Sequence, residues 1–483
     1  MPELTLSLPA ADLPIYLRLA RALVADVRRG RLRPGERLPG SRALATQLGV
    51  HRNTVLAALE ELRAEGWIEA RAGSGTFVCA ELPEPEAPRG KSRSAVGAFH
   101  LRPPPSLPGG DLPDPTEAPP PGALVLAGGL PDLRLLPVQE LARELRRAMG
   151  RHGPAVLGYG DPAGLPRLRG ALADLLRARR GIAAGPSSVL VTRGSQQGLY
   201  LAAQILVRPG DRVAVEALGY RPAWHALALA GAELVPLAVD AEGLSVVALE
   251  AALAQGPLRA VYLTPQHQFP TMAVLPAARR LRLLELARQH RFVVIEDDYD
   301  HEFHYEGAPV LPLAASDPAG SVVYVGTLSK VLAPGLRLGF VVAGEALIAA
   351  MAVRRRVIDR QGDQATEEAI ARLIEDDTIP RHIRRMRRIY AQRRQVVVEA
   401  VRRDLAGVVD PRPPPGGLAL WPAVDPAVDV VAWAGRAREA GVVFEPGRSF
   451  HLHDAPQAAF RLGFGCLEPE ELREAVRRLA RAL

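Results

Sequence analysis

Lysine is almost absent from the chain, which uses arginine for nearly all of its positive charge. A lysine beside a predicted strand is therefore expected to have a role that arginine cannot fill. Of the 60 lysine and arginine residues among 483, only Lys91 and Lys330 are lysines. The apolar run 322–325 predicts a buried strand of an α/β sheet, and Lys330 follows it closely. Arginine keeps its charge at any working pH, whereas a partly desolvated lysine amine can lose its proton and form a Schiff base. Lys330 is therefore expected to act through its amine, and Lys91 to be a solvated charge.

The residues around Lys330 suit a phosphate group. Thr327 and Ser329 supply two hydroxyls, and Arg337 supplies a guanidinium. Hydroxyls together with a planar fork of N–H donors are well matched to phosphate oxygens. The segment therefore combines a reactive amine with a predicted anion site.

Two further predicted strands end in polar residues. The apolar run 292–295 is followed by Asp297 and Tyr299, at the strand end where open α/β sheets place their ligands. A carboxylate there can hold a pyridine nitrogen protonated and so make the ring an electron sink. The run 189–192 leads through a small polar turn, 193–197, into a predicted helix whose first N–H groups can bind phosphate. Together with Lys330, these features predict a site for pyridoxal 5'-phosphate (PLP).

At these residues the chain resembles the fold-type I, class I aminotransferases, from about residue 123 to residue 483. The resemblance is carried by Tyr159-Gly-Asp-Pro-Ala-Gly164 with Leu168-Arg169, by Thr192 to Gln197, by Asp297 and Tyr299, by Ser329-Lys330 with Arg337, and by Arg461-Leu-Gly-Phe464. It implies a large α/β domain and a small C-terminal α+β subdomain that begins at about residue 380.

The same resemblance implies a role for each matching residue. Lys330 would form the Schiff base with PLP, Asp297 would contact the pyridine nitrogen and Tyr299 the ring hydroxyl, while Tyr220 would stack on the ring. Arg461 would hold the carboxylate of an amino compound. The implied phosphate contacts are Ser195, Gln196, Thr327, Ser329 and Arg337, joined by Tyr159 from the partner subunit.

The N-terminal 80 residues follow a different pattern. Residues 15–30 and 51–65 have helical periodicity, and between them a short helix, 42–48, is predicted with Ser41 as its N-cap. A two-stranded wing with a glycine-rich tip is expected at 67–78. Because the third helix buries Val55, Leu59 and Leu62, its N-terminal residues face outward, as in a recognition helix that enters a major groove.

This segment resembles the GntR-type winged helix-turn-helix over residues 12–79. The motifs are Arg33-Pro-Gly-Glu-Arg-Leu-Pro39, Ser41-Arg42-x-Leu44-Ala45, Leu48-Gly49-Val50-x-Arg52-x-Thr54-Val55 and Gly73-Ser-Gly-Thr-Phe-Val78. By this resemblance the DNA contacts would be Arg42, Arg52, Asn53 and Thr54, with Gly73 and Ser74 at the wing tip. Leu56 stands where relatives often carry another arginine, which leaves the base preference open.

A proline-rich linker, 81–122, is expected between a head at 1–80 and a body at 123–483. The head holds eleven arginines against eight acidic residues and the whole chain carries +7, which mildly favours double-stranded DNA as a partner. Cys79 and Cys466 have no metal spacing and are expected to be buried thiols. No signal peptide or membrane span is evident, so a cytoplasmic protein is expected.

The order of head, linker and body resembles the MocR subfamily of bacterial transcription regulators, whose members are typically head-to-tail homodimers. In the stretch Thr264-Pro-x-His267-Gln268-Phe-Pro270, Gln266 and the nearby Met272 replace a serine and a glycine that are common in relatives, which opens the question of effector specificity. The arginine-dense run 354–394 is expected to form a helix with one buried and one solvated face; a basic track for bent DNA is the alternative.

Three functions are compatible with these patterns. The leading hypothesis is a PLP-dependent regulator, not an enzyme, in which an amino compound displaces Lys330 to form an external aldimine and so alters promoter binding. A working aminotransferase that carries a DNA tether is the second hypothesis. A sensor of PLP itself, which controls vitamin B6 supply, is the third.

Overall fold

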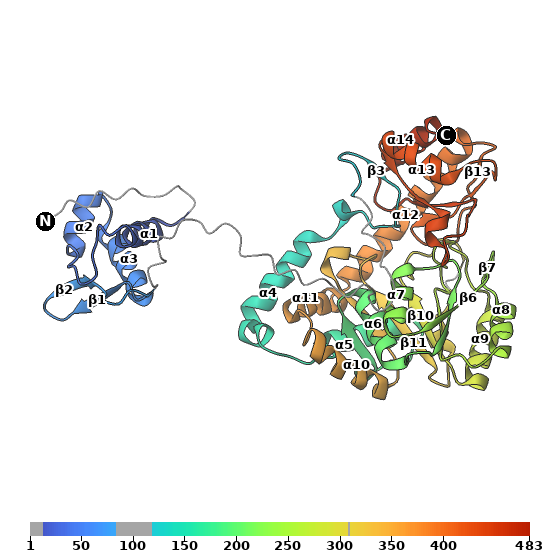
Figure 1. Ribbon diagram of the computed structural model, residues 1–483, viewed down its shortest axis with the longest axis horizontal. Coiled ribbons are helices and arrows are strands. Elements are labelled where there is room, and N and C mark those ends of the chain that lie inside the picture. The colour runs from blue at the N-terminus through green and yellow to red at the C-terminus, as the bar shows by residue number, and fades with distance from the viewer. Residues whose placement is uncertain (1–12, 84–117, 308–309) are drawn as a thin grey trace. The chain divides into compact units, whose positions relative to one another are not determined.

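The structure is a computed structural model and describes residues 13–83, 118–307 and 310–483. The chain divides into two compact units, residues 1–102 and 103–483 (Figure 1). Most of the expected linker, and with it Lys91, lies outside the described residues. The two units are called the head and the body.

The head consists of three helices and a two-stranded antiparallel sheet: α1 (Ile15–Arg28), α2 (Ser41–Leu48), α3 (Arg52–Ala64), β1 (Ile68–Arg71) and β2 (Gly75–Val78). Its core contains Leu23, Leu44, Val55 and Leu62, each no more than 2% exposed. Gly73, at the turn of the hairpin, has a φ of 71°, which an L side chain rarely adopts. The predicted winged helix-turn-helix is therefore confirmed.

The prediction that Ser41 caps α2 is wrong. Gly40 is the N-cap, with extended backbone (φ −60°, ψ 153°), and Ser41 is the first residue of the helix. Glycine is also tolerated at this position, so the helix can begin one residue earlier than the serine suggests. The Ser41 hydroxyl instead accepts a hydrogen bond from Nε of Arg52 (3.4 Å), which joins the N-terminal ends of α2 and α3.

The body is built on a seven-stranded sheet of order β4-β12-β11-β10-β9-β5-β6. The strands are β4 (Val189–Thr192), β5 (Arg212–Glu216), β6 (Glu233–Leu237), β9 (Ala260–Leu263), β10 (Val293–Asp298), β11 (Val322–Thr327) and β12 (Gly339–Val342). Only β12 runs antiparallel to its neighbours, β4 and β11. The predicted strands 189–192, 292–295 and 322–325 are thus confirmed, and β10 and β11 are adjacent.

Helices cover both faces of this sheet, as expected for a sheet with apolar strands on both sides. One face packs against α6 (Gly194–Leu206), α7 (Arg221–Leu229) and α10 (Glu345–Ile358). The other packs against α5 (Pro166–Arg180) and α11 (Gln364–Glu375) at one end and α8 (Val246–Ala254) and α9 (Ala277–His290) at the other. The long helix α4 (Val138–Leu157) lies against α11 (Figure 1).

A smaller subdomain follows, with a core built around Trp433, Phe444 and Phe460. It comprises the C-terminal part of α12 (Thr378–Asp404), the helices α13 (Val430–Glu439) and α14 (Pro469–Arg481), and the three-stranded sheet of β14 (Ala419–Leu420), β18 (Phe460–Gly463) and β17 (Glu445–Pro446). Shorter strands complete the body: β3 (Leu124–Val125), β7 (Val239–Asp240), β8 (Gly243–Leu244), β13 (Val409–Asp410), β15 (Ala423–Val424) and β16 (Val442–Val443).

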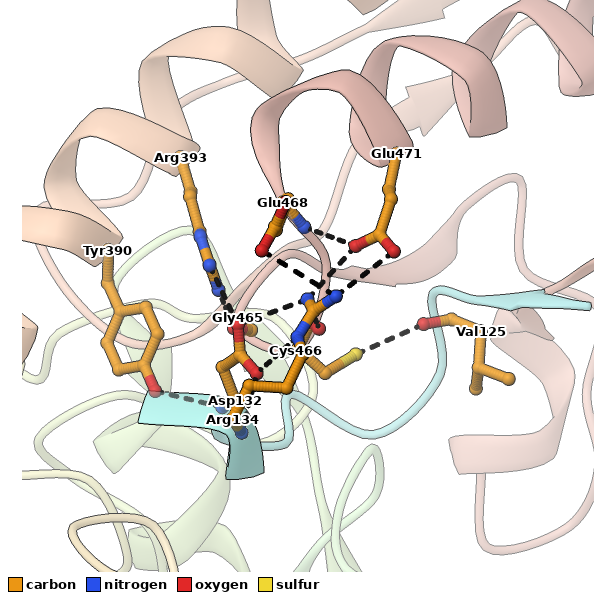
Figure 2. A network of polar contacts seen from close by, with 9 residues as sticks. All are labelled: Val125, Asp132, Arg134, Tyr390, Arg393, Gly465, Cys466, Glu468 and Glu471. Atoms are coloured by element: carbon orange, nitrogen blue, oxygen red, sulfur yellow. Dashed lines mark hydrogen bonds and ion pairs between the residues drawn. The ribbon is translucent and has the colours of Figure 1, made fainter. Parts of the chain in front are cut away.

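The segment before α4 also belongs to this subdomain, which the sequence did not indicate. Strand β3 pairs in parallel with β16. Asp132 forms an ion pair with Arg393 of α12 (2.8 Å), and Arg134 forms one with Glu471 of α14 (3.0 Å) (Figure 2). This segment is therefore attached to the C-terminal subdomain by backbone pairing and by charge.

The arginine-dense run 354–394 forms parts of three helices, α10, α11 and α12, rather than one. Within α12 the predicted buried face is present, because Ile383, Met386 and Tyr390 are at most 7% exposed. The arginines between 381 and 388 are exposed, whereas Arg393 and Arg394 are buried and pair with Asp132 and Glu306. The expected solvated basic face therefore ends before residue 393.

Cys79 and Cys466 are both partly exposed, so the expectation that they are buried is wrong. The Cys466 thiol donates a hydrogen bond to the Val125 carbonyl (3.3 Å), which is another link between the segment before α4 and the small subdomain (Figure 2). Within the described ranges, no helix is both long enough and apolar enough to cross a membrane.

Candidate functional site

One cavity of the body collects nearly all of the residues predicted for the cofactor and the effector. It has a volume of about 330 Å³ and lies at the carboxyl ends of β10 and β11. Its lining includes Lys330, Asp297, Tyr299, Tyr220, Ser195, Gln196, Thr327, Ser329, Arg337 and Arg461. Five residues that the sequence analysis did not single out as lining residues are Gly128, Thr264, Phe269, Pro334 and Glu445.

Lys330 lies just beyond β11, in the turn where the strand ends. Its amine donates a hydrogen bond to the Gly128 carbonyl (3.4 Å) of the segment attached to the small subdomain. Burial, helped by the nearby Arg461 guanidinium, lowers the pKa of Lys330 from 10.5 to about 8. With a pKa about one unit above pH 7, roughly a tenth of the amine is neutral at that pH, and this neutral form is the nucleophile.

Asp297 lies near the end of the neighbouring strand β10 and is almost completely buried. Oδ2 accepts a hydrogen bond from the Tyr262 hydroxyl (2.9 Å), while Oδ1 is buried with no hydrogen-bond partner. Burial raises the pKa of Asp297 to about 7. A buried carboxylate oxygen without a partner is costly, so a donor supplied by a ligand would stabilise it.

The N-terminus of α6 and the turn after β11 contribute polar groups to the lining of the cavity. Ser195 and Gln196 lie in the first turn of α6, and the hydroxyls of Thr327 and Ser329 lie 3.0 Å from each other. Arg337 donates from Nη2 to the Arg193 carbonyl (3.0 Å) at the start of α6.

A glycine is required where Arg337 crosses the start of α6. Gly194 has a φ of 75°, and a Cβ there would lie 3.0 Å from the Arg337 guanidinium. The small residue therefore lets the positive side chain approach the N–H groups that the helix leaves free. Hydroxyls, helix N–H groups and a guanidinium in one place are suited to a phosphate.

Arg461 lies on β18 and is 1% exposed, yet no carboxylate of the described residues pairs with it. Nη1 donates to the Pro270 carbonyl (3.0 Å), and the guanidinium lies 4.3 Å from the centre of the Phe269 ring. Nε is buried without a partner. A buried, unpaired guanidinium that faces a cavity is suited to an anionic ligand group.

Tyr159 is the predicted cofactor residue that does not line the cavity. It lies just after α4, is 83% exposed, and packs under the Arg360 guanidinium at 4.2 Å. Its contact with the cofactor phosphate of a partner subunit stays a prediction.

Aromatic side chains form one wall of the cavity. Tyr220, the N-cap residue of α7, meets Phe269 edge to face at 5.4 Å, and Phe269 meets Tyr299 in the same way at 6.0 Å. Phe269 belongs to the Thr-Pro-x-His-Gln-Phe-Pro stretch, so this motif could have predicted Phe269 as a residue that lines the cavity.

The two departures in that stretch have different positions. Gln266 is buried, does not line the cavity, and accepts a hydrogen bond from Arg280 (3.4 Å). Met272 is 2% exposed with a φ of 64°, a backbone conformation that favours the glycine found in relatives. Its sulfur lies 3.4 Å from Nη1 of Arg461 and 3.7 Å from the Tyr299 hydroxyl, so only Met272 touches residues of the cavity.

The head presents a separate polar surface. Arg42 lies in the first turn of α2, while Arg52 and Asn53 begin α3; all three are exposed, and Thr54 is partly exposed. His51 caps α3 through Nδ1, which accepts from the Asn53 N–H (3.2 Å). Gly73 and Ser74 are exposed at the tip of the wing.

The chain matches two protein families. Residues 15–78 match the family "Bacterial regulatory proteins, gntR family", and residues 125–479 match "Aminotransferase class I and II". The solved structure of LysN, an α-aminoadipate aminotransferase from Thermus thermophilus complexed with N-(5'-phosphopyridoxyl)-L-leucine, is 31% identical, with a TM-score of 0.70, and the match covers 75% of this chain and 92% of LysN. The two matches define a DNA-binding regulator whose second part has the fold-type I aminotransferase fold.

Two curated relatives match along nearly the whole chain. The probable rhizopine catabolism regulatory protein MocR of Rhizobium meliloti is 36% identical over 98% of this chain and 94% of its own length. The HTH-type transcriptional regulator TauR of Rhodobacter capsulatus is 35% identical over 98% of both proteins. The chain belongs to the MocR-type subfamily of the GntR transcription regulators.

Proposed function

We propose that the body holds PLP on Lys330 and that a small amino compound in the same cavity changes how the head binds DNA. The observation that carries this proposal is the position of a neutralisable lysine, a buried carboxylate with a free oxygen and an anion site around one cavity. The residues fit the cofactor: Asp297 would accept from its ring nitrogen, and Tyr299, which also lines the cavity, would contact its ring hydroxyl. Ser195, Gln196, Thr327, Ser329 and Arg337 would hold its phosphate.

PLP would supply an aldehyde for primary amines and an electron-withdrawing ring, and the protein residues supply everything else. The neutral amine of Lys330 would be the nucleophile that holds the cofactor and the group that gives way to an incoming amine. Asp297 would hold a proton at the ring nitrogen through Oδ1. Arg461 orients the incoming compound by its carboxylate, and Phe269 and Tyr220 limit water at that side.

The size of the cavity limits the effector. Ligand pockets usually measure about 300–1,000 Å³, and 330 Å³ is at the small end of this range. We therefore expect the effector to be a compact amine. A compound that prefers one arrangement of the body shifts the population of arrangements, by tenfold for every 1.4 kcal/mol or so of preference.

In the same proposal the DNA contacts are Arg42, Arg52, Asn53 and Thr54, with the wing tip at Gly73 and Ser74. Exposed arginines bind phosphates or guanine, and the N-terminal end of a recognition helix is the part that reaches base edges. The domain limits proposed are a head at 1–80, a linker at 81–122 and a body at 123–483.

The experiment pairs absorbance spectra with DNA-shift measurements on the wild type and Lys330→Ala. The duplex is selected from a random pool by the wild-type protein. We expect the wild type to show the absorbance of covalently bound PLP and a change of DNA affinity when an effective amine is added. Lys330→Ala should lose both responses and keep basal DNA binding. A variant that keeps the absorbance and the amine response would overturn the proposal.

We further propose a homodimer in which Tyr159 reaches the phosphate in the partner's cavity. The exposure of Tyr159 supports this. Dimers formed by mixing Tyr159→Phe with Lys330→Ala carry one cavity free of both substitutions if Tyr159 acts across the interface. Mixing should then restore wild-type PLP affinity to that fraction of sites, and no restoration would exclude a contribution from the partner.

A working aminotransferase is the second candidate, because every residue expected for PLP in one chain lines the cavity. Turnover requires that an amino acid and a keto acid are both processed. Production of keto acid over many cycles per site would favour this candidate, whereas a stable spectral change without keto acid favours the regulator.

A further inference from the structure

Glu445 places a carboxylate in the lining of the cavity. It has no role in the proposed binding of the cofactor or in the proposed binding of the effector's carboxylate by Arg461. It lies on β17 and lines the cavity, and its carboxylate forms no hydrogen bond or ion pair with any other described residue. Burial raises the pKa of Glu445 although Arg461 and Lys330 lie near enough to oppose the rise. The carboxylate is therefore partly desolvated without a direct partner. This costs free energy unless a cationic group of a ligand pairs with the carboxylate.

The Arg461 guanidinium, whose charge acts on Glu445, makes its direct contacts with other groups. Glu445 and Arg461 are directly paired residues of the antiparallel strands β17 and β18, so their side chains start on one face of the sheet. Arg461 nevertheless turns toward the Pro270 carbonyl, the Phe269 ring and the Met272 sulfur, at 3.0, 4.3 and 3.4 Å. One guanidinium and one carboxylate thus face the same cavity and act on each other electrostatically, but they form no ion pair.

The other two positively charged residues of the cavity, Lys330 and Arg337, already have a role in binding the cofactor. In the proposed function, which this inference extends, the Lys330 amine binds the cofactor and Arg337 binds its phosphate. Arg461 and Glu445 remain for the effector. A ligand with a carboxylate at one end would satisfy Arg461 and leave Glu445 unpaired, whereas a ligand that also carries a second cation would satisfy both.

We propose that Glu445 selects an effector with a second amine, a diamino carboxylic acid. One amine of the compound replaces Lys330 on the cofactor, the carboxylate binds Arg461, and the second, protonated amine pairs with Glu445. No bond to Glu445 is formed or broken, since its contribution is an ion pair in a partly desolvated site.

The test compares amino acids of equal size with and without the second amine. L-ornithine is matched with L-norleucine, and L-2,4-diaminobutyrate with L-norvaline, on the PLP-loaded protein, and the dissociation constant is taken from the change in absorbance. We expect at least one diamino acid to bind tenfold more tightly than its neutral match, which corresponds to about 1.4 kcal/mol. Glu445→Gln should reduce that preference to less than threefold.

Glu439→Gln is the matched control, because Glu439 is exposed at the end of α13 and its substitution removes the same charge from the same subdomain. It should keep the full preference. Equal binding of matched amino acids by the wild type, or an unchanged preference in Glu445→Gln, would overturn the role of Glu445 and leave the proposed function intact. A loaded protein whose spectrum responds to no amine at all would overturn the proposed function together with the inference.

Discussion

The head and the body use charged residues in opposite ways. In the head the proposed contacts, such as Arg42 and Arg52, are exposed side chains at the beginnings of helices. In the body Lys330, Asp297 and Arg461 are enclosed around one cavity, and burial moves the pKa of Lys330 down to about 8 and that of Asp297 up to about 7. Exposed charges are screened by salt, and buried ones much less so.

Because the charges of the head are exposed and those of the body are buried, different measurements suit the two parts. DNA binding by exposed arginines should fall steeply with salt, because each neutralised phosphate contributes about 0.9 to the salt slope on duplex DNA. Binding of PLP by enclosed groups should depend mainly on pH and on single hydrogen bonds. Salt dependence therefore tests the head, and pH dependence tests the body.

The largest effect is expected for Arg52→Ala. Loss of a phosphate or guanine contact costs about 1–3 kcal/mol, so DNA affinity should fall about 5-fold to 150-fold, and the salt slope should decrease by about 0.9 if the contact is to phosphate. The absorbance of bound PLP should not change. Arg63→Ala, at the exposed other end of α3, is the control and should keep the slope. Equal losses in both variants would mean that α3 does not bind DNA by its N-terminal end.

Asp297→Asn tests the cavity of the body, and its expected effect on PLP affinity is similar in size to the effect of Arg52→Ala on DNA affinity. The substitution keeps the shape but removes the charge that would hold a proton on the ring nitrogen. Hydrogen bonds to charged groups contribute about 1.5–3 kcal/mol, so PLP affinity should fall at least tenfold, as measured by equilibrium dialysis. Raising the salt concentration should leave this difference nearly unchanged. Full PLP affinity in the variant would show that Asp297 does not contact the ring.

The pH dependence of PLP uptake follows from the lowered pKa of Lys330. Only the neutral amine attacks the aldehyde, and the neutral fraction rises as pH passes upward through the pKa. Because burial has lowered that pKa from 10.5 to about 8, the rate constant for uptake by the PLP-free protein should increase between pH 7 and 8 and level off above about 9. Stopped-flow absorbance measures it. A rate that still rises steeply up to pH 10 would contradict the buried, lowered amine.

The smallest effect is expected for Tyr262→Phe. The Tyr262 hydroxyl donates to Oδ2 of Asp297, and its removal should raise the pKa of Asp297 further. A single hydrogen bond contributes about 0.5–1.5 kcal/mol, so PLP affinity should fall by a factor of about 2 to 10. In combination with Asp297→Asn the loss should be less than the product of the two. Multiplicative losses would mean that Tyr262 acts independently of Asp297.

Local patterns were sufficient for much of the fold. Apolar runs predicted β4, β10 and β11, and helical periodicity together with turn residues predicted the winged head. The start of α2 was misplaced by one residue because serine and glycine are both favourable N-caps. Motifs around Lys330, Asp297 and Arg461 also indicated which residues meet in one cavity.

Other parts of the site depend on long-range packing, which leaves no local pattern. Gly128 reaches Lys330 only because its segment is attached to the small subdomain through Asp132 and Arg134. Glu445 enters the cavity through the pairing of two short strands, and nothing in its neighbours marks it as a ligand-facing residue. Arg393 could not be distinguished by sequence from the exposed arginines before it, since its acidic partner lies 261 positions away.

The most direct test of the account is to locate the bond between PLP and the protein. The PLP-loaded protein is reduced with borohydride, digested, and analysed by peptide mass spectrometry. Lys330 and Lys91 are the two lysines in the chain, so each serves as the control for the other. The account predicts one stoichiometric adduct on the peptide with Lys330 and none on the peptide with Lys91. An unmodified Lys330 after reduction would contradict it.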